Sequence, residues 1–125
     1  MSQPDEALLR GRRILIVEDE ALVAMLVEDA LLEVGCRIVG PAATVAEALA
    51  LLEREMPEAA VLDLNLSGET SAPVADALVR QGVPFLVASG YGVAGLPPAH
   101  RGVPVLAKPY DPDELTAALA RLCAT

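Results

Sequence analysis

The sequence predicts an α/β fold, a doubly wound five-stranded parallel sheet with helices on both faces. Five short apolar segments alternate along the chain with amphipathic segments of helical period. The first apolar segments are continuous rather than alternating, as expected of strands that are buried on both faces of a sheet. Hydrophobic residues make up 54% of the 125 residues, which is enough for the core of one domain.

The first strand and helix follow a polar lead of about ten residues. Residues 14–17 form a continuous, β-branched run that is typical of a buried strand. Apolar residues then recur at helical spacing, and Gly35 stands where a helix C-terminal glycine belongs. The residues expected on the inner face of this helix are Val23, Leu26, Val27, Ala30, Leu31 and Val34. Residues 37–40 are a weaker strand, expected near a sheet edge.

The middle of the chain supplies a second helix and a third strand. Thr44 and Glu47 have the spacing of a capping box, and the helix that they open is expected to stop before Pro57. Residues 59–62 form the next buried strand. We expect a loop containing Gly68 to lead from this strand to the following helix.

The last part of the chain supplies two strands and two helices. We expect a helix over residues 73–80 and a strand over residues 85–88, whereas the glycines and prolines of 90–102 permit only a short helix. Residues 103–107 form the fifth strand, and its proline favours an edge position. Residues 111–114 combine an N-cap aspartate, a proline at the first helical position and a capping glutamate, which open the closing helix.

The composition excludes several classes of function. The formal net charge of -9 opposes binding to nucleic acid or to an anionic membrane. Cys36 and Cys123 have no metal-ligand spacing and are expected to be reduced thiols. No signal peptide and no membrane-spanning run is present in the sequence. We therefore expect a soluble, cytoplasmic protein that makes no contact with nucleic acid or membrane.

Polar side chains follow four of the five predicted strands. Glu18 and Asp19 end the first strand, Asp63 ends the third, Ser89 the fourth and Lys108 the fifth. In doubly wound sheets, ligands bind outside the carboxyl ends of the strands, where the strand order reverses. Each of these residues alone is compatible with a solvated loop, but their joint placement predicts one functional site.

The acidic residues of this set predict a magnesium site. Carboxylates that converge from adjacent strands repel one another unless a cation or protons intervene, and all-oxygen ligation favours Mg²⁺. We expect Glu18 and Asp19 to hold the ion directly or through water, with further oxygens from Asp63 and the backbone carbonyl of Asn65. Asp19 could also cap the first helix, and the two roles are compatible.

Asp63 is the candidate nucleophile, expected to be held at its strand end yet exposed. A carboxylate can accept a phosphoryl group to give an acyl phosphate, and this transfer needs Mg²⁺ and a positioned cation. Lys108 can supply that cation, and Ser89 can donate a hydrogen bond to a phosphoryl oxygen. A surface role for Lys108 and a local backbone bond for Ser89 remain the alternatives.

These residues resemble the response-regulator receiver domain, from Arg12 to Leu122. The matching pieces, specific in their order and spacing, are Ile-Leu-Ile-Val-Glu18-Asp19-Glu20, Val-Leu-Asp63-Leu-Asn65-Leu, Ala-Ser89-Gly90 and Lys108-Pro109-Tyr110. The resemblance implies a flavodoxin-like sheet of strand order 2-1-3-4-5. It also implies a receiver domain over residues 11–125, behind a flexible N-terminal lead of residues 1–10.

The resemblance further implies a role in a two-component phosphorelay. A histidine kinase or a histidine phosphotransfer protein would give a phosphoryl group to Asp63 in the presence of Mg²⁺. Ser89 and Lys108 would sense it, and the peptide between Lys108 and Pro109 would be cis. The signal would pass on by conformational change or by onward phosphate transfer to a downstream protein. The phosphorylated chain would dephosphorylate itself, without being a turnover enzyme.

Two departures from the common receiver pattern bear on signalling. Val105 stands where many receivers carry a Tyr or Phe whose rotation is coupled to phosphorylation, so that switch is not available here. The run 84–91 partly resembles the "FAT GUY" receivers, a group associated with HWE-type histidine kinases. Because few residues follow the closing helix, the chain is either a single-domain regulator or part of a longer one.

Three other functions fit the predicted fold. The first is a degenerate receiver that acts by protein contact without phosphorylation, which the complete set of five site residues disfavours. The second is a phosphohydrolase of the haloacid dehalogenase type, which needs a second aspartate where this chain has Asn65. The third is a flavin- or nucleotide-binding module, which needs a glycine-rich loop where residues 17–20 carry three acids and no glycine.

Overall fold

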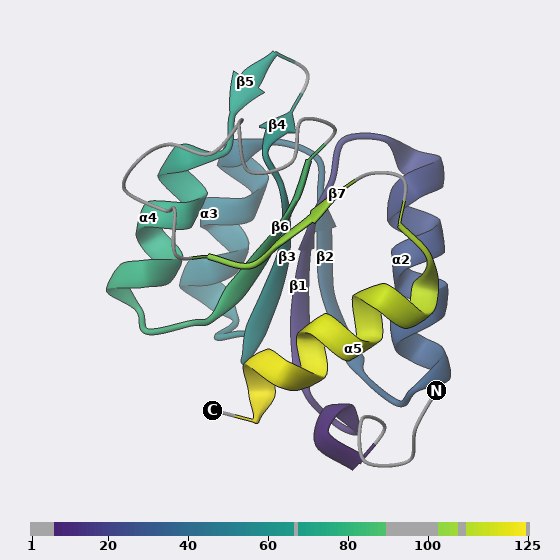
Figure 1. The fold of residues 1–125 in the computed structure, drawn as a ribbon. Coiled ribbons are helices and arrows are strands. Elements are labelled where there is room, and N and C mark those ends of the chain that lie inside the picture. Colours follow the sequence, from purple (N-terminus) through teal and green to yellow (C-terminus); the bar gives the residue numbers. More distant parts are fainter. Residues whose placement is uncertain (1–6, 67, 90–102, 108–109, 125) are drawn as a thin grey trace.

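The computed structural model describes residues 7–66, 68–89, 103–107 and 110–124. Its centre is a five-stranded sheet with the order β2-β1-β3-β6-β7, in which all neighbouring strands are parallel (Figure 1). The strands are β1 (Arg13–Val17), β2 (Arg37–Ala42), β3 (Ala59–Asp63), β6 (Phe85–Ser89) and β7 (Val105–Ala107). Numbered along the chain, the strands of this sheet have the order 2-1-3-4-5, so the predicted flavodoxin-like fold is confirmed.

Helices cover both faces of the sheet (Figure 1). They are α2 (Ala21–Glu33), α3 (Val45–Arg54), α4 (Ala72–Arg80) and α5 (Pro112–Cys123). Helices α3 and α4 form one core with the sheet, and α2 and α5 form the other. Within the described ranges, none of the helices is long and apolar enough to cross a membrane.

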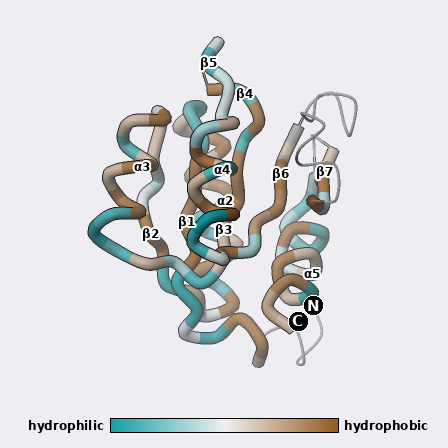
Figure 2. Tube along the Cα trace, turned by 90° about the vertical axis from the view of Figure 1, so that its left-hand side faces the viewer, coloured by the Kyte–Doolittle hydropathy of each residue, from teal (hydrophilic) through white to brown (hydrophobic). Residues whose placement is uncertain are grey.

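The strands are apolar because the sheet separates two cores. In β1, Leu15 and Val17 belong to the core under α3 and α4, whereas Ile14 and Ile16 belong to the core under α2 and α5. All four side chains are almost fully buried. Figure 2 shows the strands of this sheet as mostly hydrophobic stretches of the trace. The continuous run in the sequence therefore reflects burial on both faces.

The two edge strands are those that the sequence predicts. Strand β2 lies at one edge and β7 at the other. Pro104, which has no amide hydrogen, directly precedes β7, and its carbonyl accepts from the amide of Val87 at 2.9 Å. An edge position suits a proline because no second neighbour requires a donor from this residue.

Both predicted helix caps are present, with one difference in detail. Asp111 accepts from the amide of Glu114 at 2.9 Å, and the Glu114 carboxylate accepts from the Asp111 amide at 3.2 Å. Thr44 accepts from the amide of Glu47 at 3.1 Å. The Glu47 carboxylate, however, bonds the amide of Ala43 rather than that of Thr44, at 2.9 Å. In the capping box of α3, the bond made by the glutamate side chain is therefore displaced by one residue.

Helix α2 differs from the prediction in the face that it buries. Leu26, expected in the core, is 60% exposed, and Ala24 is buried instead. Leu22 and Met25 are also exposed, so the helix is apolar on nearly all sides. Helical periodicity selects an inner face only when the other face is polar, which explains the error. As predicted, Gly35 follows the helix with a positive φ of 88°.

The segment after β3 is a small hairpin rather than the expected loop. Strands β4 (Asn65–Leu66) and β5 (Glu69–Thr70) form a two-stranded antiparallel sheet that projects beyond the main sheet (Figure 1). Gly68 lies in the connection with a φ of 84°, a conformation that favours glycine. The side-chain oxygen of Asn65 accepts from the Gly68 amide at 2.8 Å and holds this turn.

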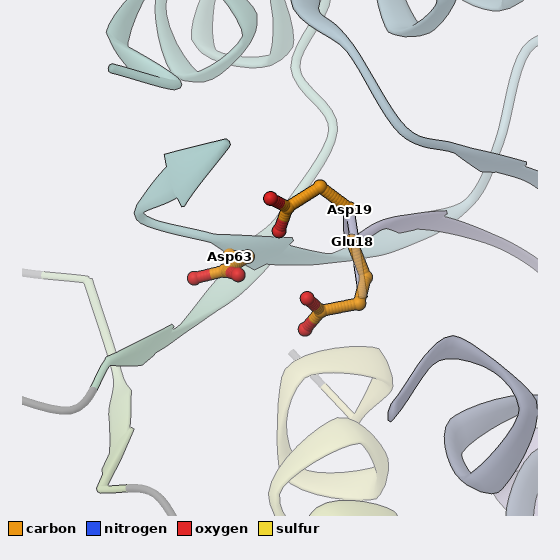
Figure 3. Close-up of side chains that lie close together, drawn as sticks. All are labelled: Glu18, Asp19 and Asp63. Carbon is orange, nitrogen blue, oxygen red and sulfur yellow. The ribbon is translucent and has the colours of Figure 1, made fainter. Parts of the chain in front are cut away.

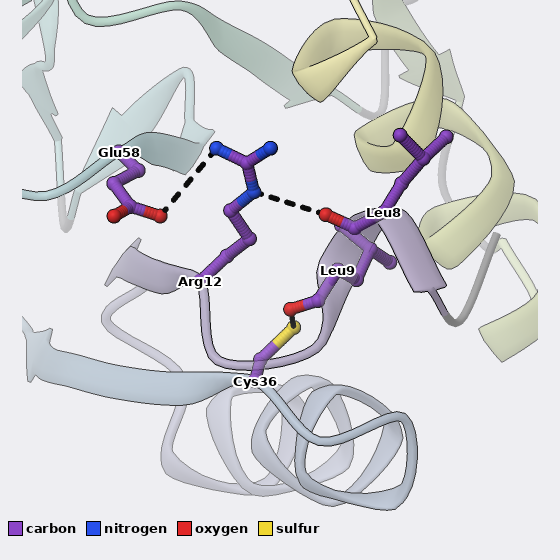
Figure 4. Close-up of polar contacts among 5 residues, drawn as sticks. All are labelled: Leu8, Leu9, Arg12, Cys36 and Glu58. Atoms are coloured by element: carbon purple, nitrogen blue, oxygen red, sulfur yellow. Dashed lines mark hydrogen bonds and ion pairs between the residues drawn. The ribbon is translucent and has the colours of Figure 1, made fainter.

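Residues 7–10 are packed against the domain, which corrects the expected boundary at residue 11. They form a short helical turn, and Leu9 is fully buried in the core of α2 and α5. Its carbonyl accepts from the thiol of Cys36 at 3.5 Å, and the guanidinium of Arg12 donates to the Leu8 carbonyl at 3.0 Å (Figure 4). The described part of the lead therefore closes one end of the core.

The two cysteines are free thiols close to this turn. Burial, and to a smaller extent the nearby Cys123, raises the pKa of Cys36 to about 11. Burial also raises the pKa of Cys123, although Arg12, which forms an ion pair with Glu58 at 3.8 Å, acts in the opposite direction. Neutral thiols are poor nucleophiles, so the buried Cys36 and the half-buried Cys123 act as small apolar groups.

We predict that Leu9→Ala lowers the free energy of unfolding by about 2–5 kcal/mol, because it leaves a cavity in a closed core. Urea denaturation followed by circular dichroism measures this change. The control is Leu22→Ala, since Leu22 is 67% exposed and its truncation should change stability by less than about 0.5 kcal/mol. Equal stabilities of the two variants would show that residues 7–10 do not belong to the domain.

Candidate functional site

Three carboxylates meet at the carboxyl end of the sheet. Glu18 and Asp19 directly follow β1, and Asp63 is the last residue of the adjacent strand β3. Each residue offers a carboxylate oxygen within 4.8 Å of those of the other two. Figure 3 shows the three side chains gathered around one space at the strand ends. The topology thus brings together the acidic residues that the sequence predicts to be neighbours.

Two of these carboxylates are nearly excluded from solvent. Glu18 is 5% exposed and Asp63 is 7% exposed, whereas Asp19 is half-buried. The expectation that Asp63 would be exposed is therefore wrong. Strand β3 is the central strand, with β1 and β6 on either side, so its last residue is flanked by backbone rather than by water. A carboxylate in such a position requires charge compensation.

Backbone amides hold the acidic residues in place. The amide of Glu18 donates to the carbonyl of Ala42 at 2.9 Å, and its carboxylate accepts from the amide of Glu20 at 3.1 Å. The amide of Asn65 donates to Oδ1 of Asp63 at 3.4 Å. The N-cap residue of α2 is Glu20, which makes no side-chain cap bond, so Asp19 does not occupy the N-cap position considered for it above.

The donor set fits a hard divalent cation. Three carboxylates supply only oxygen ligands, and their mutual repulsion is relieved when a positive charge lies between them. Asn65, whose carbonyl is the fourth predicted ligand, is the first residue of β4 and lies two residues beyond Asp63. Its role as a ligand stays a prediction, as does the identity of the ion.

The ends of β6 and β7 lie at the same edge of the sheet. Ser89 ends β6 and pairs with Ala107 in β7, directly beside the pairing of Asp63 with Ala88. Lys108 is the next residue in the sequence after β7. The side chain of Ser89, and all of Lys108 and Pro109, lie outside the described residues. Their roles, and the expected cis peptide, stay predictions.

Two features near the site were not found from the sequence. Ser71 is 1% exposed, and its hydroxyl donates to the carbonyl of Leu64 at 3.0 Å. A serine two residues before Pro73 is typical of a helix start, which is the signal that could have identified it. The second feature is an apolar groove between α2 and α5.

This groove has a volume of about 500 Å³. Its lining residues are Glu20, Val23, Leu26, Val27, Ala30, Tyr110, Pro112 and Leu115. It begins at Glu20, immediately after the acidic pair, and it continues into the exposed apolar side chains of α2. The signal for this surface is the high number of apolar residues in α2, more than one buried face can hold.

The chain matches known proteins along most of its length. The sequence model of the family described as the response regulator receiver domain matches residues 14–120. The transcriptional regulatory protein PdtaR of Mycobacterium tuberculosis is 30% identical over 112 residues, which cover 86% of this chain. The chain spans 55% of the length of that curated relative.

Solved structures of similar proteins share this fold. The solution structure of SdrG from Sphingomonas melonis Fr1 is 44% identical, covers 98% of both chains and superposes with a TM-score of 0.79. The crystal structure of the response regulator PhyR from Brucella abortus is 28% identical with a TM-score of 0.80, and it covers 95% of this chain and 51% of PhyR. The PhyR receiver domain of Erythrobacter litoralis is 26% identical, with coverage of 90% of both chains and a TM-score of 0.81.

We predict that Asp19→Asn raises the free energy of unfolding by about 1 kcal/mol when divalent cations are chelated, because it removes one of three facing charges. Added Mg²⁺ should narrow or reverse the difference, since the variant loses a ligand. Thermal unfolding with and without Mg²⁺ measures both effects. Asp29→Asn, an equal charge change on the exposed face of α2, is the control. Equal effects of the two substitutions would contradict the proposed repulsion.

Proposed function

This chain belongs to the response regulator receiver domain family, and we propose that it accepts a phosphoryl group on Asp63 in a two-component phosphorelay. The observation that carries the proposal is the cluster of Glu18, Asp19 and Asp63, with carboxylate oxygens within 4.8 Å of one another at the end of the sheet. Three neighbouring acids, two of them buried, are costly to hold together unless a positive charge lies near them. A divalent cation would supply that charge, and it would also attract a phosphoryl group.

The proposed reaction is a transfer between a phosphohistidine and Asp63. A carboxylate oxygen of Asp63 attacks the phosphorus atom, the bond between phosphorus and the histidine nitrogen breaks, and the imidazole leaves after taking up a proton. The product is an acyl phosphate on Asp63. Mg²⁺, held by Glu18, Asp19, Asp63 and the carbonyl of Asn65, would offset the negative charge of the transferring group.

We assign the remaining steps to Ser89 and Lys108, on the basis of the sequence and the placement of their strands. Lys108 would compensate the charge of the bound phosphoryl group, and Ser89 would donate a hydrogen bond to one of its oxygens. Water would later hydrolyse the acyl phosphate and end the signal. The chain would thus dephosphorylate itself without acting as a turnover enzyme. A phosphohydrolase reaction is disfavoured because it needs a carboxylic acid as proton donor two residues after Asp63. Asn65 occupies that position, and its amide cannot act as a general acid.

Signalling must use an element other than a rotating aromatic side chain at residue 105. Val105 is half-buried and packs against the core under α3 and α4. Since a valine cannot move between a buried and an exposed aromatic position, we propose that phosphorylation shifts an existing equilibrium of the backbone near the site. The altered surface would then be recognised by a downstream protein, or the phosphoryl group would be passed on.

We propose that the phosphoryl donor docks on α2 and the groove beside α5. Leu22, Met25 and Leu26 are between 52% and 67% exposed, an unusual density of large apolar side chains on one helix. This surface begins next to Glu20, so a partner resting on it would bring its phosphohistidine to the acidic cluster. A histidine kinase, of the HWE type or otherwise, or a histidine phosphotransfer protein fits this role. Such a donor would meet the chain in the cytoplasm.

We predict that the purified protein gains one phosphoryl group from acetyl phosphate in the presence of Mg²⁺. The adduct should be absent when Mg²⁺ is chelated and absent in Asp63→Asn, because either change removes an essential part of the site. Intact mass spectrometry measures it. Asp29→Asn, which removes an exposed carboxylate on α2, should be phosphorylated like the wild type. A phosphorylated Asp63→Asn protein would move the acceptor elsewhere, and an adduct formed without metal would contradict the magnesium site.

We also predict that Met25→Glu slows phosphotransfer from a histidine kinase by at least about tenfold, because it buries a charge in the docking surface. Its reaction with acetyl phosphate should be unchanged. Val79→Glu is the matched control, since Val79 is similarly exposed, at 58%, but lies on α4 across the sheet. Radiolabelled transfer from a kinase that phosphorylates the wild type measures the difference. Equal transfer to both variants would exclude α2 as the docking helix.

A further inference from the structure

We propose that Ser71 is a positioning residue for Asp63, and that it acts through the peptide group that joins Leu64 to Asn65. This inference rests on the proposed role of Asp63 as phosphoacceptor and adds a residue to it. Ser71 stands at the start of α4, eight residues beyond Asp63, and it is 1% exposed. Its hydroxyl is one of the few buried polar side-chain groups within the described residues.

Ser71 binds a single carbonyl twice. Its amide donates to the carbonyl oxygen of Leu64 at 3.1 Å, and its hydroxyl donates to the same oxygen at 3.0 Å. The amide of Leu64 in turn donates to the carbonyl of Ala88 in β6 at 3.2 Å. The chain immediately after Asp63 is therefore fixed on both sides, to the start of α4 and to the neighbouring strand.

The carbonyl of Leu64 and the amide of Asn65 belong to the same planar peptide group. In a trans peptide these two groups point in opposite directions, so fixing the oxygen also fixes the direction of the N–H. This N–H donates to Oδ1 of Asp63 at 3.4 Å. A bond of that length is weak and cannot by itself orient the peptide. The two bonds from Ser71 at the opposite side supply the orientation.

Two donors on one carbonyl also polarise the peptide. Hydrogen bonds in a chain strengthen one another, so the Asn65 amide becomes a better donor to the carboxylate when the Leu64 oxygen is doubly bonded. The Ser71 hydroxyl thus helps to hold one oxygen of Asp63 in a constant direction. A constant carboxylate direction favours in-line attack on phosphorus, because the alignment is already set before the donor arrives.

A capping role does not explain the hydroxyl of Ser71. Although Ser71 occupies the N-cap position of α4, its side chain makes no cap bond there. The amide of Ala72 is instead bonded by Oγ1 of Thr70, at 3.2 Å. The hydroxyl of Ser71 is committed to the Leu64 carbonyl, which lies beside the phosphoacceptor.

The first test is made on the unphosphorylated protein. In Ser71→Ala the amide proton resonance of Asn65 should move upfield in the NMR spectrum, because its bond to Asp63 weakens. The matched control is Thr116→Val, which removes a fully buried hydroxyl that bonds the carbonyls of Pro112 and Asp113 in α5. It should leave the Asn65 resonance unchanged. An unchanged resonance in Ser71→Ala would overturn the proposal.

The second test is the rate of phosphorylation by acetyl phosphate with Mg²⁺. Ser71→Ala should react about tenfold more slowly than the wild type, Thr116→Val should react at the wild-type rate, and Ser71→Thr, which keeps the hydroxyl, should recover most of the rate. Should the alanine variant fail to fold, Ser71→Cys keeps the volume with a much weaker donor and carries the same prediction. Equal rates for Ser71→Ala and Thr116→Val would overturn the positioning role.

The two tests separate this inference from the proposed function. A wild-type protein that takes no phosphoryl group refutes the phosphoacceptor role of Asp63, while the Asn65 resonance still reports whether Ser71 controls the bond to its carboxylate. A wild-type protein that is phosphorylated, with a Ser71→Ala variant of equal rate, refutes only the positioning role.

Discussion

Glu18, Asp19 and Asp63 bring carboxylate oxygens to within 4.8 Å of one another, and the repulsion among these charges is the constraint on which the rest of the site depends. Two of the three side chains are at most 7% exposed, so water can screen the repulsion only in part. Such a cluster is stable only when the fold supplies compensation and holds each acid in place. We propose that the compensation is a divalent cation, which would also favour the arrival of a phosphoryl group beside it.

The scaffold meets this constraint through hydrogen bonds of the backbone. The parallel pairing of β1 with β3 sets the acidic pair beside Asp63, and amides from the following residues bond the carboxylates of Glu18 and Asp63. The start of α4 then fixes the chain beyond Asp63 through Ser71 and Leu64. Each of these bonds joins the site to a strand or a helix that is anchored in one of the two cores. The placement of the acidic residues therefore depends on the packing of the whole domain.

The sequence was sufficient to predict the sheet and the acidic cluster because both follow from simple rules. Continuous apolar runs identify buried strands, and the topology of a doubly wound sheet places the ends of β1 and β3 side by side. It was not sufficient where tertiary packing decides between local alternatives. The periodicity places Leu26 in the core wrongly because apolar side chains lie on nearly all sides of α2. Leu9 is buried because the turn of residues 7–10, which the sequence predicts to be part of a polar lead, packs against the core. The burial of Asp63 and the hydrogen bonds from Ser71 to the Leu64 carbonyl also depend on contacts between segments apart in the sequence. Hydrophobic periodicity does not predict such contacts.

The proposed roles of the three carboxylates are tested by a crystal structure of the protein grown with Mg²⁺ and beryllofluoride, a mimic of the phosphoryl group. We expect beryllium bonded to a carboxylate oxygen of Asp63, with Mg²⁺ coordinated by Glu18 or Asp19, by Asp63 and by the carbonyl of Asn65. We also expect Ser89 and Lys108 to contact the fluorine atoms. Beryllofluoride bound to another residue would refute Asp63 as the phosphoacceptor, and a metal that contacts none of the three carboxylates would refute the proposed magnesium site.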